Sequence, residues 1–331
     1  MNDVPADPFA ERGGRRFHRH YWLLGARFDF ESDSRQLLAL VDQAFAGLPA
    51  HRLEGARRCR IRLVLGRTPY AARLSRAPSA PRLSAGAGLL CAVMDAGNFA
   101  VVDPREASAL IVAAPSALRF PYYLRYELIE FAVQTLAARS GGLVPLHAAC
   151  LASRGRAVLL VGDSGTGKST LCLHALIGGL EIVSEDSVFV AARGRKATGL
   201  ASFLHLRSDS LAQVKRGTAA ELRRAPTIRR RSGVSKLEVD LRRRFALALR
   251  PPRIEAVVFL SRRRRRGALL VALSAPAMLR RLRALQPYAV AAASWPAFER
   301  SLRGVAAFEL GRGAHPAASV DALRTFLESA D

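Results

Sequence analysis

AVLLVGDSGTGKST, residues 157–170, is the stretch that decides the fold of this chain. An apolar run ending at Val161 predicts a buried strand, and the residues after it match the phosphate-loop pattern G-x-x-x-x-G-K-[ST]. Glycines let such a loop curl until its backbone N–H groups point at phosphate oxygens, and the following helix adds its positive end. The stretch therefore predicts an α/β domain that binds a nucleotide. The expected phosphate contacts are Gly162, Asp163, Ser164, Gly165, Thr166, Gly167, Lys168, Ser169 and Thr170.

Within this loop, Lys168 is expected to reach the β and γ phosphates and Ser169 to bind Mg²⁺. Lysine is rare elsewhere in the chain: lysine and arginine together number 51, and only four of these are lysines. An arginine fork is a poor replacement for the compact lysine charge, so a lysine at this place supports the phosphate-loop interpretation.

Two acids follow the predicted helix that runs from Lys168 to about Ile177. Leu180–Val183 is a short apolar segment typical of a strand, and Ser184, Glu185 and Asp186 come directly after it. Adjacent strand residues point to opposite sides, so we expect only one of the two acids to face the γ phosphate. A carboxylate there can hold Mg²⁺ or accept the proton of an attacking hydroxyl. The alternative is a solvated acidic pair at a strand end.

Three more polar residues are candidates that also have structural explanations. His147 lies in a predicted strand just before the loop, among small apolar residues, where a histidine is more often structural than catalytic. Asp209 is a second candidate metal or phosphate ligand, with a helix cap as the alternative. His174, inside the helix after the loop, is expected to pack or to face solvent.

Three segments, Leu146–Ala149, Val158–Thr170 and Ile182–Asp186, together resemble the kinase domain of HPr kinase/phosphorylase. They are closer to the shorter HPr-kinase-like proteins of bacterial clusters, including those that phosphorylate lasso-peptide precursors. In that family a histidine precedes the loop by one strand, and an Asp-Asp pair stands where this chain has Glu185 and Asp186. The resemblance extends more weakly over most of residues 143–331.

The resemblance implies a P-loop kinase domain of the HPr-kinase/PEP-carboxykinase-like type. It implies that Asp186 is the catalytic base, that Lys168 steadies the transferred phosphate, that Ser169 binds Mg²⁺ and that His147 assists. Two features of the phosphorylases are missing: an Arg-Gly-Leu-Gly motif and a loop with proline and glycine. We therefore expect a kinase without the reverse activity, for which HPr is a doubtful substrate.

The composition limits the class of protein. With 331 residues, half of them apolar, the chain is long enough for two domains of about 100–200 residues each. Its charge of +24 includes runs of arginine, but no nucleic-acid-binding module accompanies them, so nucleic acid is not the favoured partner. The sequence shows no secretory signal and no apolar stretch of the roughly 18–20 residues that a membrane span needs. Four scattered cysteines suit a reduced compartment, and we expect a cytoplasmic protein.

The predicted organisation is a flexible tail over residues 1–16, a smaller α+β domain over 17–142 and the catalytic domain over 143–331. The first domain is expected to hold one strand over Tyr21–Glu31, a loop over Thr68–Gly88 and a helix over Pro121–Arg139. In the second, Leu146–Leu151 is expected to be a strand, and the basic stretch Lys215–Arg244 is expected to be an exposed excursion or a mobile flap.

Together these features predict a kinase that uses ATP and Mg²⁺ to phosphorylate a hydroxyl, that of a serine, in a peptide or protein. The predicted catalytic residues are Asp186, His147 and Lys168, and the predicted metal ligands are Ser169, Glu185 and Asp209. An acidic acceptor, such as a ribosomally made precursor peptide, would suit the basic chain. A nucleotide-dependent switch, a small-molecule kinase and a nucleic-acid-directed ATPase remain as alternatives, and the oligomeric state stays open, homo-oligomers included.

Overall fold

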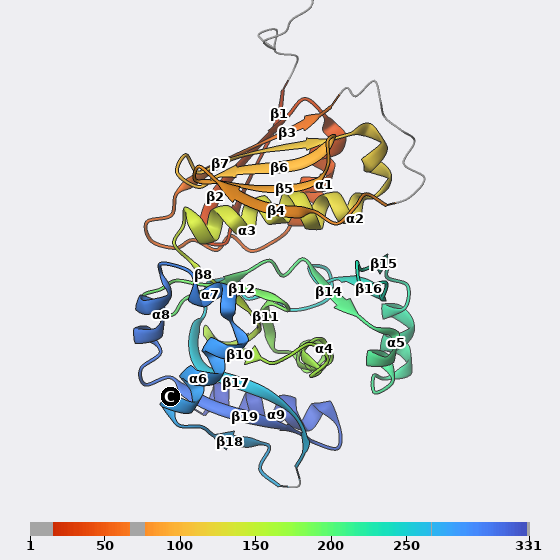
Figure 1. Cartoon of the computed structure of the whole chain (residues 1–331). Helices are drawn as coiled ribbons and strands as arrows, with labels where there is room; N and C mark the ends of the chain where they lie inside the picture. Colours follow the sequence, from red (N-terminus) through yellow and green to blue (C-terminus); the bar gives the residue numbers. More distant parts are fainter. Residues whose placement is uncertain (1–15, 67–76, 266, 330–331) are drawn as a thin grey trace, which may run out of the picture. The chain divides into compact units, whose positions relative to one another are not determined.

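The computed structural model describes residues 16–66, 77–265 and 267–329. The expected tail, residues 1–16, therefore lies outside the described residues except for Arg16. The chain divides into two compact units (Figure 1). Among the described residues, the first unit holds 16–21, 28–46 and 58–136, and the second holds 22–27, 47–57 and 137–329.

A seven-stranded sheet with helices forms the first unit, and its strand order is β1-β2-β3-β7-β6-β5-β4. The strands are β1 (Phe17–Leu23), β2 (Ala26–Ser32), β3 (Arg58–Leu65), β4 (Arg82–Gly86), β5 (Leu89–Asp95), β6 (Asn98–Asp103) and β7 (Ser108–Ala113). The helical segments are α1 (Arg35–Phe45), η1 (Pro115–Arg119), α2 (Pro121–Leu124), the π-helical η2 (Arg125–Ile129) and α3 (Glu130–Arg139). Helix α1 begins after Ser34, whose hydroxyl accepts a hydrogen bond from the Leu37 N–H.

Two expectations for the first unit are wrong. The single strand over Tyr21–Glu31 is two strands, because Leu24 and Gly25 both adopt positive φ and form a turn between β1 and β2. The loop expected over Thr68–Gly88 contains strand β4, which pairs with β5; residues 67–76 of that loop lie outside the described part. Pairing with a neighbouring strand overrides the weak strand preference of a segment rich in serine and glycine.

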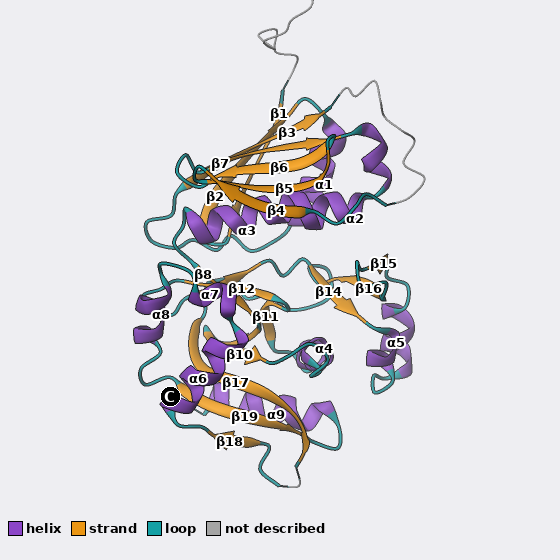
Figure 2. Cartoon of the chain, in the orientation of Figure 1, coloured by secondary structure: helices purple, strands orange, loops and turns teal. Residues whose placement is uncertain are grey.

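The second unit is built on a mixed six-stranded sheet with the order β11-β9-β10-β17-β19-β18. Its strands are β9 (Ala149–Ser153), β10 (Arg156–Val161), β11 (Glu181–Ser184), β17 (Arg253–Arg264), β18 (Leu270–Ala272) and β19 (Ala306–Arg312). Strands β10, β17 and β19 are parallel to one another, whereas β9 is antiparallel to β10 and β11. The chain is thus a mixed α/β protein (Figure 2).

Alternating side chains of the central strands supply two separate cores. Val158 and Leu160 of β10 lie in one core with residues of α4 and α9, and Leu159 and Val161 lie in the other with residues of α6 and α8. This is the period-two alternation of a strand buried on both faces. The helices of the unit are α4 (Lys168–Ile177), α5 (Arg216–Leu222), α6 (Ala275–Leu285), α7 (Pro287–Val290), α8 (Trp295–Ser301) and α9 (Pro316–Glu328).

Two small three-stranded sheets complete the second unit. One has the order β13-β12-β8, with β8 (Val144–His147), β12 (Ser187–Val190) and β13 (Ala197–Gly199). The other has the order β14-β16-β15, with β14 (Phe203–Leu206), β15 (Thr227–Arg229) and β16 (Ser235–Asp240). None of the helices formed by the described residues is long and apolar enough to cross a membrane.

The third and fourth corrections concern these small sheets. The strand expected over Leu146–Leu151 is interrupted at Ala148, so β8 and β9 belong to different sheets. The segment Lys215–Arg244 is mostly exposed, as one of its two expected forms required, but it is not irregular: it contains α5, β15 and β16, and Leu237 and Val239 of β16 are buried. Strand β16 pairs with the nearby β15 and also with β14, whose residues lie more than 30 positions earlier, and a local pattern does not reveal the second contact.

Candidate active site

The phosphate loop follows β10 at one edge of the six-stranded sheet. Strands β17 and β19 run parallel to β10, so their carboxyl ends reach the same edge. Strand β11 is antiparallel to β9, which is antiparallel to β10, so the end of β11 lies there too. The sheet therefore brings the loop, the acids after β11 and the ends of β17 and β19 together, as expected for ligand sites in α/β sheets.

The backbone of the loop fits the conformation that a phosphate cradle requires. Gly165 and Gly167 have φ angles of 78° and 99°, in the left-handed region that side chains rarely adopt. Gly167 is the N-cap of α4, the helix predicted over Lys168–Ile177. The Thr166 N–H and hydroxyl both donate to the Asp163 carbonyl, at 3.2 Å and 2.8 Å, which closes the loop on itself.

Lys168 is buried against this loop, and its ammonium group donates a hydrogen bond to the Gly162 carbonyl. Burial lowers the pKa of Lys168, and the negative charge of Asp186 is the largest effect that opposes this shift. Two arginines from the neighbouring strands donate hydrogen bonds to carbonyl groups of the loop. Arg262 of β17 donates to the Ser164 carbonyl and Arg312 of β19 donates to the Thr166 carbonyl, both at 3.2 Å.

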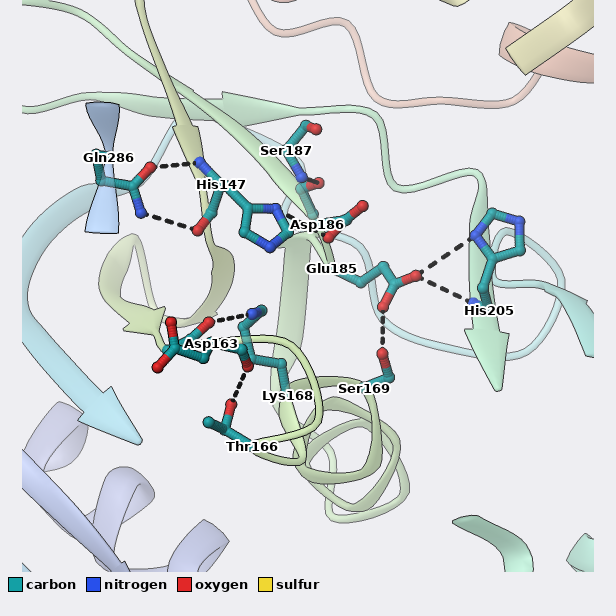
Figure 3. A network of polar contacts seen from close by, with 12 residues as sticks. His147, Asp163, Thr166, Lys168, Ser169, Glu185, Asp186, Ser187, His205 and Gln286 are labelled. Atoms are coloured by element: carbon teal, nitrogen blue, oxygen red, sulfur yellow. Dashed lines mark hydrogen bonds and ion pairs between the residues drawn. The ribbon is translucent and has the colours of Figure 1, made fainter. Parts of the chain in front are cut away.

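The two acids after β11 lie in different environments, as Figure 3 shows. Glu185 is buried, and its Oε2 accepts a hydrogen bond from the Ser169 hydroxyl at 2.9 Å. Its Oε1 accepts the backbone N–H of His205 at 3.1 Å and forms an ion pair with the His205 ring at 3.5 Å. Burial favours the neutral carboxyl, but these contacts, led by the His205 side chain, outweigh it and lower the pKa of Glu185.

Asp186 is the more exposed acid and is paired with the predicted histidine. Its Oδ1 lies 3.2 Å from Nδ1 of His147, and the side chains are 36% and 55% exposed, so another molecule can reach them. The backbone of His147 is fixed by Gln286, whose amide donates to the His147 carbonyl at 3.0 Å and accepts its N–H at 2.8 Å. Because Ser187, the residue after Asp186, pairs with His147 across the strands, His147 and Asp186 lie close together.

One groove of about 840 Å³ contains most of these groups. Its lining includes residues of the loop together with His147, Asp186, His205, Arg207, Asp209, Arg230 and Lys236. A smaller cavity of about 270 Å³ adjoins the same loop at Thr166 and Gly167 and is bounded by the end of β19 and the two residues after it, Gly311–Ala314. The groove has room for phosphate groups and for a second reactant.

Asp209 and His174 are the remaining predicted candidates. Asp209 is within the 3-10 turn η3 (Ser208–Leu211), exposed and 3.2 Å from Arg207; the cap of that turn is Arg207, so the cap alternative for Asp209 is wrong. His174 is buried in α4 and packs edge-on against the His315 ring, 5.1 Å between centroids, as a packing residue does.

Sequence reasoning missed His205, Glu238 and Gln286. His205 and Glu238 are opposite each other in the β14–β16 ladder, with 3.3 Å between Nε2 of the ring and Oε1 of the acid. Both acids and the ring are buried, and hydrogen bonds to Glu185 and Glu238 raise the pKa of His205 although burial opposes this. A signal was present: a histidine and a glutamate each alternate with apolar residues in Leu204–Leu206 and Leu237–Val239.

Comparisons with known proteins add little to this geometry. No family model matches the sequence, and no curated protein is similar to it. Among solved structures, the Hpr(Ser) kinase/phosphatase from Coxiella burnetii aligns with 55% of this chain and 95% of its own, at 14% identity and a TM-score of 0.29. That similarity is distant, and the roles discussed below rest on the site itself.

The chemistry of the donor set fits a hard cation. Hydroxyl and carboxylate oxygens of Ser169, Glu185, Asp186 and Asp209 are the ligand types that Mg²⁺ prefers. Among the described residues, no cluster of three or more histidine, cysteine or acidic side chains is arranged around a common point for a metal ion. Mg²⁺ in phosphate-binding sites usually takes one or two protein ligands and completes its shell with phosphate oxygens and water.

Proposed function

We propose that this chain is a kinase that uses ATP and Mg²⁺ to phosphorylate the hydroxyl of a serine in a peptide or protein. The observation that supports this proposal is a single groove lined both by the phosphate loop and by the exposed Asp186–His147 pair. A phosphate loop alone serves many kinds of ATPase. A carboxylate that an acceptor can reach beside the loop is what transfer to a hydroxyl requires.

In the proposed reaction the acceptor oxygen attacks the γ-phosphorus of ATP, the bond from that phosphorus to the bridging oxygen breaks, and ADP leaves. The hydroxyl proton passes to the Asp186 carboxylate. His147 holds that carboxylate in place through the 3.2 Å contact. Lys168 and the loop N–H groups offset negative charge on the phosphates.

Ser169 would hold Mg²⁺. Of the two acids predicted as metal ligands, Asp209 lines the groove, and Glu185 would act behind Ser169 by accepting its hydroxyl hydrogen. When bound, Mg²⁺ neutralises charge on the β and γ phosphates. The protein's own contribution is to present the Ser169 oxygen at the first turn of α4, directly after the loop.

The acceptor is proposed to be acidic. Arg207, Arg230 and Lys236 line the groove that also holds Asp186, and they come from the region of β14, β15 and β16. Cationic side chains beside a reactive carboxylate attract a segment with carboxylates and thereby compensate for its repulsion by Asp186. Lys236 is one of only four lysines in the chain, so its presence here is not explained by the general excess of arginine.

The test uses ATP labelled on the γ phosphate, Mg²⁺ and three sets of serine peptides, acidic, neutral and basic, with mass spectrometry of the product. We expect labelled phosphoserine, mostly in the acidic set, and none with Lys168→Ala. Lys236→Gln should raise KM for acidic peptides about 3- to 10-fold, in line with the loss of one favourable charge. The matched control, Lys196→Gln, removes a lysine that does not line the groove and should leave KM unchanged.

Other outcomes separate the rival functions. If no hydroxyl is phosphorylated but a partner binds differently to the ATP and ADP forms, the chain is a switch. Phosphorylation of small alcohols in preference to every peptide would make it a small-molecule kinase. ATP hydrolysis stimulated by DNA or RNA, with steep salt dependence, would indicate a nucleic-acid-directed ATPase.

A further inference from the structure

A buried polar chain runs from the phosphate loop into the β14–β16 sheet. Its members are Ser169, Glu185, His205 and Glu238, joined in that order by contacts of 2.9, 3.5 and 3.3 Å. Glu185 is 8%, His205 8% and Glu238 6% exposed. Figure 3 shows the part from Ser169 to His205, with Glu185 between them.

Such an arrangement is not explained by stability alone. Two buried carboxylates and a buried imidazole lose much hydration, and well-packed apolar residues of similar volume are often at least as stable. The flanking residues Leu204, Leu206, Leu237 and Val239 pack in the apolar core on the other face of this small sheet, whereas His205 and Glu238 are buried on the face that meets Glu185. The polar chain therefore serves a purpose at its exposed end, where Ser169 lines the groove.

The geometry at Ser169 indicates that purpose. A serine hydroxyl has one hydrogen, and here it is donated to Oε2 of Glu185. The Ser169 oxygen is then left with lone pairs only, so towards the groove it can act as a ligand but not as a donor. Glu185 can keep this orientation only while its other oxygen is fixed, and the donors that fix it are the N–H and the ring of His205.

We propose that His205 and Glu238 are positioning residues that fix Glu185, so that Glu185 holds the Ser169 hydroxyl ready to bind the divalent cation of a nucleotide–Mg²⁺ complex. This inference rests on the proposed function only in taking ATP and Mg²⁺ as ligands. It assigns Glu185 an action through Ser169, while Asp186 on the other side serves the acceptor. Glu238 supports the chain by holding the far nitrogen of the ring.

The two nitrogens of the ring allow a sharp test. In His205→Asn the amide nitrogen occupies about the place of Nδ1 and keeps the contact with Glu185. In His205→Gln it lies near the place of Nε2 and keeps the contact with Glu238 instead. The readout is the dissociation constant of a non-hydrolysable ATP analogue, measured without and with Mg²⁺; their ratio is the enhancement by Mg²⁺. No acceptor is needed.

We expect Ser169→Ala and His205→Gln to reduce the enhancement by roughly 10-fold or more, as loss of an outer-shell partner of a metal site does. His205→Asn should stay within about 3-fold of the unchanged protein, because it retains the donor to Glu185. The matched control is His51→Asn, which changes another buried histidine of the same unit, bonded to Thr198 and the Ala248 carbonyl. It should alter stability but not the enhancement.

The proposal would be overturned if His205→Asn and His205→Gln lost the enhancement by Mg²⁺ equally, or if His205→Gln kept it in full. It would also be overturned if the unchanged protein showed no enhancement. If His205→Gln does not fold, as judged by circular dichroism, Glu238→Gln takes its place: a severalfold smaller enhancement supports the proposal and an unchanged one overturns it. Failure of the kinase assay with the expected enhancement pattern would instead refute only the proposed function.

Discussion

Glu185 and Asp186 are neighbours in the chain, yet they lie in regions of opposite character. Glu185 points into the protein, where a hydroxyl, a backbone N–H and a ring fill its hydrogen-bonding sites. Asp186 lies in the groove with a half-exposed side chain and a single histidine contact in the described structure, to His147. One strand end thus places one acid in a fixed network and presents the next to whatever enters the groove.

The two acids are therefore suited to different tasks. A carboxylate whose sites are filled by three donors is held still and cannot readily take a proton from a reactant. A half-exposed carboxylate beside a histidine can approach an acceptor and change its protonation state during the reaction. We therefore infer that the buried acid orders the site and that the exposed acid takes part in the chemistry.

Substitution of the exposed acid, Asp186, should change the rate more than substitution of the buried acid, Glu185. Asp186→Asn removes the proton acceptor but preserves size and the phosphate loop, so kcat should fall on the order of 10³-fold, within the range for a general base. The affinity for ATP should change little. Measurement of kcat by phosphopeptide formation and of nucleotide affinity by titration separates the two.

The control for that variant is Asp321→Asn, which alters an exposed aspartate on α9, where it pairs with Arg324. It should leave kcat as it is. A wild-type rate in Asp186→Asn would remove this residue from the role of base.

A smaller effect is expected on the buried side. In Glu185→Gln the amide can no longer accept all three hydrogen bonds, so one buried donor loses its partner, which costs about 1–3 kcal/mol of unfolding free energy. The Mg²⁺ concentration for half-maximal activity should rise roughly 10- to 100-fold while kcat at saturating Mg²⁺ falls much less. Denaturant unfolding and a Mg²⁺ titration of activity measure these two quantities.

The opposite pattern, a collapse of kcat that saturating Mg²⁺ does not restore, would show that Glu185 takes part in the chemistry and that the two acids are not divided as described. The conservative variant Glu185→Asp tests whether the length of this side chain matters. The shorter side chain keeps the charge but should not contact both Ser169 and His205.

Local pattern was sufficient to predict one half of this site. The strand before the loop and helix α4 over Lys168–Ile177 are confirmed, because apolar periodicity and glycine positions act over a few residues. Phosphate binding by the loop between them remains a prediction. The expectation that Glu185 and Asp186 point in different directions follows from strand geometry and agrees with their contacts. The roles of these residues remain predictions.

The other half could not be predicted, because it depends on contacts between distant segments. His205 meets Glu238 only through the β14–β16 pairing, and Gln286 meets His147 across 139 positions of sequence. The segment over Lys215–Arg244 appears as an arginine-rich excursion when its own sequence is considered. It becomes an ordered sheet because Leu237 and Val239 are buried once β14 lies beside them.

A smaller change is expected at His51, a buried histidine away from the site, where the quantity affected is the pH dependence of stability. His205 has acidic partners that raise its pKa, whereas His51 has neutral ones: Thr198 at 2.8 Å and the Ala248 carbonyl at 2.7 Å. Burial lowers the pKa of His51 from the ordinary 6.5, with the Ala248 hydrogen bond opposing. The unfolded chain therefore binds a proton below about pH 6.5 that the folded protein resists, so this histidine's contribution to stability is present above that pH and is lost as the pH falls.

The measurement is the unfolding free energy, from denaturant titration, at several pH values between about 7.5 and 5.5, a window set by the ordinary histidine pKa. The advantage of the unchanged protein over His51→Asn should be greatest at the upper end and shrink towards the lower end, since only the unchanged protein carries the unfavourable proton linkage. An advantage that grows as the pH falls would mean that His51 is charged in the folded protein. The pKa values of His51 and His205 would then shift in the same direction, although their hydrogen-bonding partners differ in charge.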